Sequence, residues 1–162
     1  RQGYAARADL GGGVVLTLCH PLDYFRWLFG EVVQVKSFAG HVSDLEVQTE
    51  DLAEILFRFE TGVIGSLHLD YCQQPPQHRM EIVCTGGTIR WDNADGAVQV
   101  YQAGNPATVA WETYSVPAGF DRNEMFLDLT RHFRAVVQGE QKPVCDLQDG
   151  IRALELALQA RG

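Results

Sequence analysis

The sequence lacks two features of proteins that bind membranes or nucleic acids. No apolar stretch approaches the roughly 20 residues that a membrane-spanning helix needs. Lys and Arg are scattered along the chain, and the formal net charge is −8, so no basic surface is expected for a phosphate backbone. We therefore expect neither a membrane nor a nucleic acid as a partner. The first residues do not show the charged and then apolar pattern of a secretory leader, and we expect a cytoplasmic protein.

The cysteines form no C-x-x-C pair, which argues against a structural zinc site. An even number of cysteines permits disulfides. Because no secretory pattern is present, we instead expect reduced and mostly buried thiols. The residues concerned are Cys19, Cys72, Cys84 and Cys145.

The common short motifs for cofactors and nucleophiles are also missing. There is no G-x-G-x-x-G after a strand, no P-loop, no H-E-x-x-H and no G-x-S-x-G. Gly11-Gly12-Gly13 is not a dinucleotide fingerprint, because no strand–turn–helix crossover surrounds it. We expect this chain alone to bind neither a nicotinamide cofactor nor a metal.

What is present is the composition of one ordinary globular domain. The chain has 162 residues, 46% of them hydrophobic and 21% charged, which is enough for one domain with a real core. It begins at Arg1 rather than Met, and we expect it to be a piece of a longer protein. Residues 1–13 are interpreted as a connector, and residues 14–162 as the domain itself.

The segment after the glycines has helical periodicity. Leu18, Leu22, Phe25 and Phe29 fall on one face of a helix over residues 14–29. Pro21 cannot donate a hydrogen bond to the preceding turn, so it either kinks this helix or lies in the first turn of a shorter one. We expect the kink.

Strand patterns dominate the middle of the chain. Residues 52–60 and 63–72 flank Thr61-Gly62 as a hairpin, and residues 79–84 and 88–92 flank Gly86-Gly87 as a second one. Together with residues 32–43, 97–102 and 108–115, they predict about seven strands.

The last third returns to helical periodicity. One stripe contains Met125, Leu129, Phe133 and Val136 or Val137, and Gly139 ends that helix. Another contains Leu147, Ile151, Leu154 and Leu158, with Asp146 as its N-cap. Helices at both sequence ends of a block of strands predict an α+β fold with one open, mainly antiparallel sheet and helices packed on one face. The uncovered face is a candidate for self-association.

His20 is the leading candidate for chemistry, because a histidine side chain donates or accepts a proton near neutral pH. The alternative is a histidine that packs and hydrogen-bonds without chemistry. Thr17 lies one helical turn earlier and is able to bind a ligand, the imidazole or only its own helix backbone. Tyr24 and Trp27 share the face of His20 and would line a sugar-sized pocket or pack between domains.

Other polar residues lie on or near the predicted strands. His68 and Asp70 share one strand face, with Arg79 near an adjacent strand, and they form either a general-base pair or a solvated face. Tyr71 marks a strand end from which a loop would reach a ligand. Glu50 and Asp51 are interpreted as the solvated start of a strand.

Several stretches occur in an order and spacing that are specific in combination. The first runs from the glycines through His20 to the Trp-Leu-Phe-Gly-Glu-Val sequence at 27–32, and the others are residues 50–51, 59–67, 85–92 and 146–150. Together they resemble the C-terminal part of the glucose–fructose oxidoreductase/inositol dehydrogenase (Gfo/Idh/MocA) family over nearly all of residues 9–162.

This resemblance implies the substrate-binding and oligomerisation domain of a two-domain NAD(P)-dependent oxidoreductase, with a dihydrodipicolinate-reductase-like C-terminal fold. In that family an N-terminal Rossmann domain holds NAD or NADP and supplies a lysine from a Glu-Lys-Pro motif, and neither is in this sequence. The family histidine corresponds to His20, as a general acid/base or a ligand of the substrate hydroxyl. Many members have an aspartate near the position of Thr17, and the spacing from there to His20 is one residue shorter here.

Two functions from different classes follow. In the first, the chain is part of an enzyme that oxidises or reduces a sugar, polyol or sugar-acid hydroxyl. His20 is then catalytic, Thr17, Tyr24, Tyr71 and Arg79 bind the substrate, and the partners are the N-terminal Rossmann domain and further copies in a dimer or tetramer. In the second, motivated by Thr17, the chain is a non-catalytic module for sheet-mediated dimerisation or ligand binding. A hydrolase using His68 and Asp70 is a distant third, since no nucleophile is placed beside them.

Overall fold

The computed structural model describes residues 3–104 and 110–161, and it divides the chain into two compact units. The first unit contains residues up to Cys72 and those from Val144 onward, and the second contains residues 73–143. Residues 1 and 2 of the predicted connector, residues 108 and 109 of the last predicted strand, and Gly162 lie outside the described residues.

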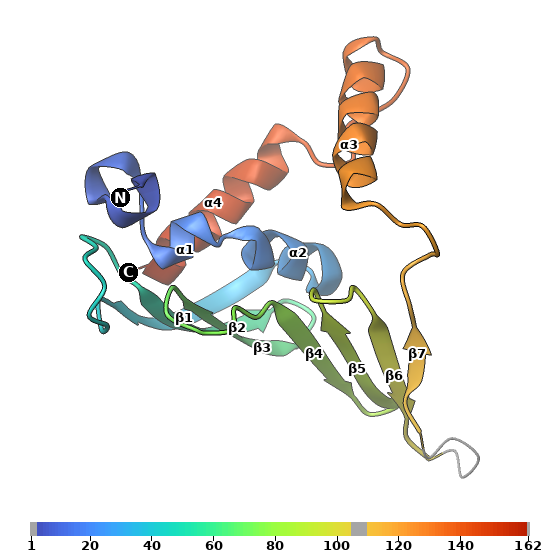
Figure 1. The fold of residues 1–162 in the computed structure, drawn as a ribbon, viewed down its shortest axis with the longest axis horizontal. Coiled ribbons are helices and arrows are strands. Elements are labelled where there is room, and N and C mark those ends of the chain that lie inside the picture. The colour runs from blue at the N-terminus through green and yellow to red at the C-terminus, as the bar shows by residue number, and fades with distance from the viewer. Residues whose placement is uncertain (1–2, 105–109, 162) are drawn as a thin grey trace. The chain divides into compact units, whose positions relative to one another are not determined.

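The first unit combines a three-stranded antiparallel sheet with helices (Figure 1). The strand order is β1-β2-β3, and β2 pairs with both neighbours. Its elements, in chain order, are the 3-10 turns η1 (Tyr4–Ala6) and η2 (Ala8–Leu10), α1 (Val14–Thr17), α2 (His20–Phe29), β1 (Val32–Gly40), β2 (Leu52–Phe59), β3 (Ile64–Asp70) and α4 (Leu147–Arg161).

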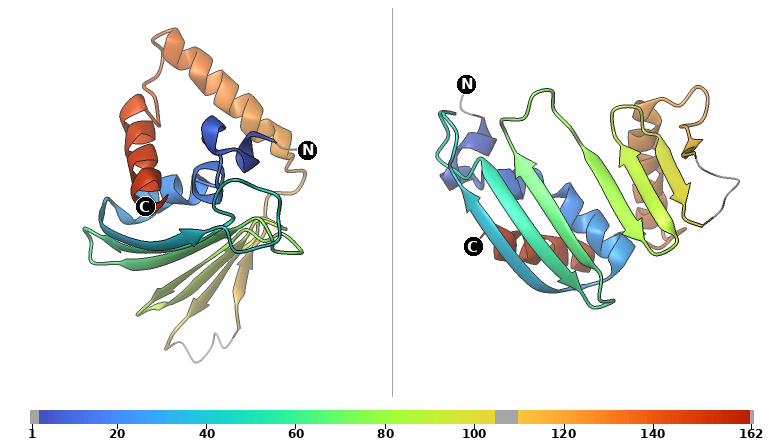
Figure 2. Two further views of the ribbon diagram at one scale, coloured as in Figure 1. Left: turned by 90° about the vertical axis from the view of Figure 1, so that its left-hand side faces the viewer. Right: turned by 90° about the horizontal axis from the view of Figure 1, so that it is seen from below.

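One face of this sheet is buried under the helices (Figure 2). Alternate residues of β2 are buried on that side, namely Ala53, Ile55, Phe57 and Phe59, and the residues between them are exposed. The Phe25 ring of α2 meets Phe57 edge-on with ring centroids 6.0 Å apart. Each aromatic side chain buried here contributes about 1.5–3 kcal/mol to stability.

The helix after the glycines differs from our expectation of one kinked helix. The structure has two helices, because α1 ends at Thr17 and α2 begins at His20. Pro21 lies in the first turn of α2, where its missing N–H costs no hydrogen bond within the helix. The alternative reading of Pro21 as a helix starter was therefore the correct one. Gly30 ends α2 with a φ of 90°.

Helix α4 begins where the sequence predicts but packs through a different face. The carboxylate of Asp146 accepts hydrogen bonds from the amides of Gln148 and Asp149 at 2.8 and 3.1 Å, which confirms it as the N-cap. The buried residues are Leu156, Ala157 and Ala160, whereas all four residues of the predicted leucine stripe are exposed. Small alanines let the helix approach its neighbours closely.

The second unit is a four-stranded antiparallel meander, in the order β4-β5-β6-β7, followed by a helix. The Asp121 side chain accepts a hydrogen bond from the Asn123 amide and caps this helix, which has no buried residue. The elements are β4 (Arg79–Cys84), β5 (Gly87–Asp92), β6 (Val98–Gln102), β7 (Glu112–Tyr114) and α3 (Arg122–Val137).

These elements confirm the α+β class and the antiparallel strands. Instead of one open sheet, the strands form two hydrogen-bonded sheets, with Pro75 and Pro76 between β3 and β4. Prolines have no N–H and cannot continue a ladder of hydrogen bonds. None of the helices in residues 3–104 and 110–161 combines the length and the apolar character needed to cross a membrane.

The cysteines are free thiols, as expected, but they are not mostly buried. Cys72, Cys84 and Cys145 are exposed, and Cys19 is half-buried. The physical reason is their position, because Cys72 and Cys84 follow or end strands at the surface and Cys145 precedes α4.

Candidate functional site

The glycine run is a tightly hydrogen-bonded segment that leads into His20. The amides of Gly11, Gly12 and Gly13 donate to the carbonyls of Ala8, Arg7 and Ala5 at 2.9–3.2 Å, and the Val14 amide donates to the Glu50 carbonyl at 3.0 Å. A free phosphate-binding loop needs amides that point at its ligand. Because these four amides are already bonded, the glycine run does not fit a cofactor phosphate.

Gly13 has a structural reason to be glycine. Its φ is 114°, which side-chain-bearing residues rarely adopt, and a Cβ at this position would overlap the Glu50 carboxylate. The backbone of the glycine run thus lies directly against Glu50.

His20 is the first residue of α2, and its side chain is exposed. The next two residues, Pro21 and Leu22, are buried and anchor the start of the helix. Within the described residues, the imidazole of His20 takes part in no hydrogen bond or ion pair. This arrangement fixes the backbone of His20 and leaves both ring nitrogens open to a partner or substrate.

Thr17 of α1 and Tyr71 after β3, two of the predicted substrate-binding residues, have neighbouring side chains. The Thr17 hydroxyl oxygen and the Tyr71 phenol oxygen are both buried and have no hydrogen bond of good geometry within the described residues. Burial raises the pKa of Tyr71, the nearby Thr17 hydroxyl acts to lower this pKa, and the charge of Glu50 adds to the rise. Their part in binding a substrate stays a prediction.

Glu50 and Asp51 are not the solvated strand start that we expected. Asp51 is completely buried, and its carboxylate accepts hydrogen bonds from the Val42 and Ser43 amides at 2.8 and 3.2 Å. Although burial acts to raise the pKa of Asp51, the hydrogen bonds from Ser43 and Val42 outweigh it and lower the pKa. The Glu50 side chain is only 8% exposed and pairs with Arg161. From the sequence alone, two adjacent acidic residues before a strand are indistinguishable from a solvated turn, because their binding partners come from other segments.

Tyr24 and Trp27 occupy different environments on α2. Tyr24 is half-buried, its ring meets Phe25 edge-on with centroids 5.2 Å apart, and burial raises the pKa of its phenol. Trp27 is 82% exposed, which is unusual for so large an apolar side chain. An exposed Trp on the helix that starts with His20 is consistent with a surface that another domain or a substrate covers.

Arg79 is the first residue of β4 and belongs to the second unit. Its backbone is paired with Asp92 of β5, and its side chain is exposed. Its part in binding a substrate together with His20 stays a prediction.

His68 is held between two carboxylates on the exposed face of the first sheet. Its Nδ1 lies 2.6 Å from Glu54 Oε1, and its Nε2 lies 3.0 Å from Asp70 Oδ2. The hydrogen bond with Glu54 raises the pKa of His68, and Asp70 adds to the rise. Because both ring nitrogens are engaged, this cluster is better suited to holding a charged imidazole than to acting as a general base.

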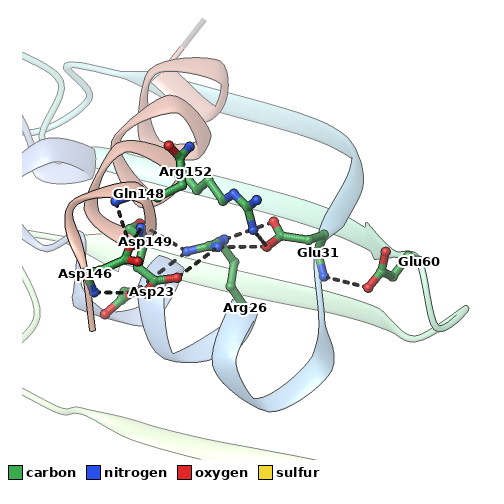
Figure 3. Close-up of polar contacts among 8 residues, drawn as sticks. All are labelled: Asp23, Arg26, Glu31, Glu60, Asp146, Gln148, Asp149 and Arg152. Atoms are coloured by element: carbon green, nitrogen blue, oxygen red, sulfur yellow. Dashed lines mark hydrogen bonds and ion pairs between the residues drawn. The ribbon is translucent and has the colours of Figure 1, made fainter. Parts of the chain in front are cut away.

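An ion-pair network that the sequence analysis missed joins α2, the start of β1 and α4 (Figure 3). The buried guanidinium of Arg26 binds both oxygens of Glu31 at 2.8 and 3.1 Å and donates to the Asp149 carbonyl at 3.2 Å. Arg152 donates to Glu31 from α4 at 2.9 Å. A cleft of about 330 Å³ lies beside this network. Since both arginines already bind Glu31, the network serves to join elements rather than to bind a ligand.

No group of three or more His, Cys, Asp or Glu side chains in the described part of the chain is arranged to hold a metal ion. Among the site residues predicted from the sequence, His20 presents an exposed imidazole at the start of α2.

Comparison with known proteins identifies the family of this chain. The family model for the GFO/IDH/MocA C-terminal domain matches residues 1–90. No curated protein sequence matches the chain.

Solved structures share the fold at low sequence identity. Levoglucosan dehydrogenase in complex with NADH is 17% identical over 98% of this chain and 50% of its own, with a TM-score of 0.83. Biliverdin reductase from Synechocystis sp. PCC 6803, in complex with biliverdin and NADP+, is 18% identical over 99% and 50%, with a TM-score of 0.76. UDP-N-acetylglucosamine 3-dehydrogenase GnnA from Acidithiobacillus ferrooxidans is 22% identical over 91% and 46%, with a TM-score of 0.73. This chain spans about half the length of these proteins.

Proposed function

Because this chain belongs to the GFO/IDH/MocA family as its C-terminal domain, we propose that it forms the substrate-binding half of an NAD(P)-dependent oxidoreductase. The substrate class is a sugar, polyol or sugar acid that carries a reacting hydroxyl. The observation that carries this proposal is the exposed His20 at the anchored start of α2, the helix that follows the glycine run and α1.

The nicotinamide cofactor binds to the N-terminal Rossmann domain of the whole protein in this proposal. When bound, it accepts or donates the hydride. The residues of this chain do not fit its phosphates, because the amides from Gly11 to Val14 are bonded to backbone carbonyls. Relatives with NADH and with NADP+ share the fold, so either cofactor is compatible with it.

His20 supplies the proton transfer. During oxidation of an alcohol, a ring nitrogen of neutral His20 accepts the proton of the hydroxyl group. The carbon that bears this hydroxyl gives up a hydride at the same time. In the reverse direction, the imidazolium returns the proton to the new alcohol oxygen. The buried residues after His20 hold the helix start, so the backbone that carries the imidazole is in place before substrate arrives.

The exposed Trp27 and half-buried Tyr24 would form one wall of the substrate site. Thr17, Tyr71 and Arg79 stay predicted substrate-binding residues. Aromatic side chains suit the apolar faces of sugar rings. The experiment is a screen of the intact protein with NAD+ and NADP+ against sugars, polyols and sugar acids, followed by absorbance of the reduced cofactor. Turnover of one of them supports the proposal, and absence of turnover with all of them contradicts it.

A second candidate function is sheet-mediated association, either alongside catalysis or as the role of a non-catalytic module. It is favoured by the open face of the first sheet, where Phe38, Leu56 and Ile64 are 86%, 56% and 69% exposed. Paired residues share a face, so these three side chains project from the same side of β1, β2 and β3. Apolar side chains gathered on an uncovered sheet face are typical of an interface between copies. The cytoplasmic location expected from the sequence stays a prediction.

A further inference from the structure

The open face of the first sheet is acidic at one end. Residues that are paired between strands lie side by side on the same face and form rows across the sheet. Glu54 lies between Phe38 and His68 in one row, and Asp70 lies in the next row toward the same end. We call Glu54, His68 and Asp70 the acidic end. Two carboxylates outnumber one imidazole there, so this end is negative whether or not His68 is protonated.

The other end of the same face is basic. Lys36 is paired with Leu56 in the row beyond Glu54, and Arg58 is paired with Ile64 in the row after that. We call Lys36 and Arg58 the basic end. Both side chains are exposed, and neither takes part in a hydrogen bond or ion pair within the described residues. The basic end is therefore open to carboxylates from outside the chain.

Apolar side chains lie among these charges. Phe38, Leu56 and Ile64 are the three exposed apolar side chains of this face that favour association, and they belong to three successive rows. Their burial would supply most of the affinity, because apolar contact is not directional. The charges would instead decide how an associating molecule is turned, since electrostatic complementarity gives specificity more than affinity. The helices of the first unit cover the opposite face of the sheet (Figure 2).

A face with opposite charges at its two ends is complementary to a second copy of itself. Two identical faces pack about a two-fold axis that lies between them. If this axis runs along the strands, equal ends meet and like charges oppose each other. If the axis runs across the strands, the acidic end of each copy lies over the basic end of the other. Only the second arrangement brings opposite charges together, and it does so in two equivalent contacts.

We propose that two copies of this chain associate through the open face of the first sheet with their strands antiparallel, so that the acidic end of each copy covers the basic end of the other. This orientation rests on the proposed sheet-mediated association. Lys36 and Arg58 then bind the carboxylates of the other copy, and Phe38, Leu56 and Ile64 are buried between the two sheets.

The test is sedimentation of the whole chain at low salt for wild type, Lys36→Glu and Glu54→Lys, each alone and the two variants as an equimolar mixture. Each substitution places a like charge in both contacts between its own copies. We expect the dissociation constant of each variant to rise at least about tenfold over wild type. In the mixture, pairing one chain of each variant restores opposite charges in both contacts. With one variant fluorescently labelled, we expect dimers that contain both chains.

The matched control is Lys142→Glu, which reverses the charge of an exposed lysine in the connection between α3 and α4. We expect it to sediment like wild type. If Glu54→Lys does not fold, Lys36→Glu alone distinguishes the two arrangements. It weakens association when opposite ends meet, and it strengthens association when equal ends meet, because it then relieves repulsion between basic ends.

Unchanged or tighter association of Lys36→Glu overturns the proposed orientation, as does a mixture of the two folded variants that contains no mixed dimers. A monomeric wild type overturns the orientation together with sheet-mediated association. These masses are read without substrate or cofactor. Turnover of a hydroxyl substrate by the intact protein therefore tests the proposed oxidoreductase function separately, and either proposal fails without the other.

Discussion

At the scale of single residues, the described chain contains buried or bridged charges whose partners come from other segments. His68 has an oppositely charged neighbour on the adjacent strand, because Glu54 of β2 lies directly opposite it in the register of β2 and β3. Cross-strand pairs of opposite charge favour the charged form of the imidazole. The stability of the fold should therefore depend on pH through the exposed imidazole of His68.

The first prediction concerns the pH dependence of His68→Gln. Since the pKa of His68 is raised in the folded state, its contribution to stability is fully present below the ordinary histidine pKa of about 6.5. It is lost as the pH rises through the raised pKa, where the imidazolium gives up its proton. The wild type therefore has a higher melting temperature than His68→Gln at slightly acidic pH, and this advantage disappears in alkaline buffer.

Thermal denaturation between about pH 5 and 9 measures this difference. His132→Gln serves as the control for the loss of a histidine outside this sheet, because its Nδ1 lies 2.8 Å from the neutral Gln141 Oε1. An advantage of the wild type that grows as the pH rises would show that Glu54 and Asp70 do not stabilise the charged imidazole.

At the scale of elements, the strands were the most predictable part of the fold. Residues 52–60 were expected as a strand and β2 covers Leu52–Phe59, because a sheet with one buried face leaves a period of two in the sequence. The break between α1 and α2 was not predicted, because a proline is compatible with both a kink and a first turn. The burial of Glu50 was also missed, since Arg161 lies at the other end of the chain.

The second prediction concerns the network that joins these elements. Arg26→Met removes the bonds from α2 to Glu31 and to the Asp149 carbonyl, and it leaves Glu31 half-exposed with Arg152. We expect the free energy of unfolding to fall by about 1.5–3 kcal/mol, the range for hydrogen bonds to charged groups. Urea denaturation followed by circular dichroism measures it.

The matched control is Arg58→Met, which changes an exposed arginine of β2. We expect its effect to stay within about 0.5 kcal/mol, as for most surface substitutions. Equal losses in both variants would contradict the role of Arg26 as the residue that joins α2 to α4.

At the scale of the whole molecule, the fold class and the family were predictable from the sequence. Which apolar faces are exposed is known only from the structure. Helix α3 was correctly predicted from its apolar stripe, yet Met125, Leu129, Phe133 and Val137 are all more than half exposed. The sequence period identifies an apolar face without saying what covers it. This chain is about half the length of its structural relatives, and the Rossmann domain of our proposal is one partner we propose for such surfaces.

The third prediction concerns association through the first sheet. We expect the chain to form a dimer or tetramer and Phe38→Asp to shift it toward monomer, because the substitution replaces an apolar side chain that is 86% exposed on this sheet face with a charged one. Light scattering or sedimentation measures the mass. The control is Val83→Asp, which changes an exposed valine of β4 in the second sheet. A monomeric wild type, or equal masses for both variants, would contradict sheet-mediated association.

The central claim is that His20 transfers the proton in a nicotinamide-dependent oxidation or reduction. Its most direct test is kcat/KM of the intact protein on the best hydroxyl substrate found, for wild type, His20→Ala and the control His41→Ala. We predict that His20→Ala lowers kcat/KM at least about 100-fold, the usual contribution of a general acid or base, while cofactor binding and the control stay close to wild type. Wild-type kcat/KM in His20→Ala would contradict the account.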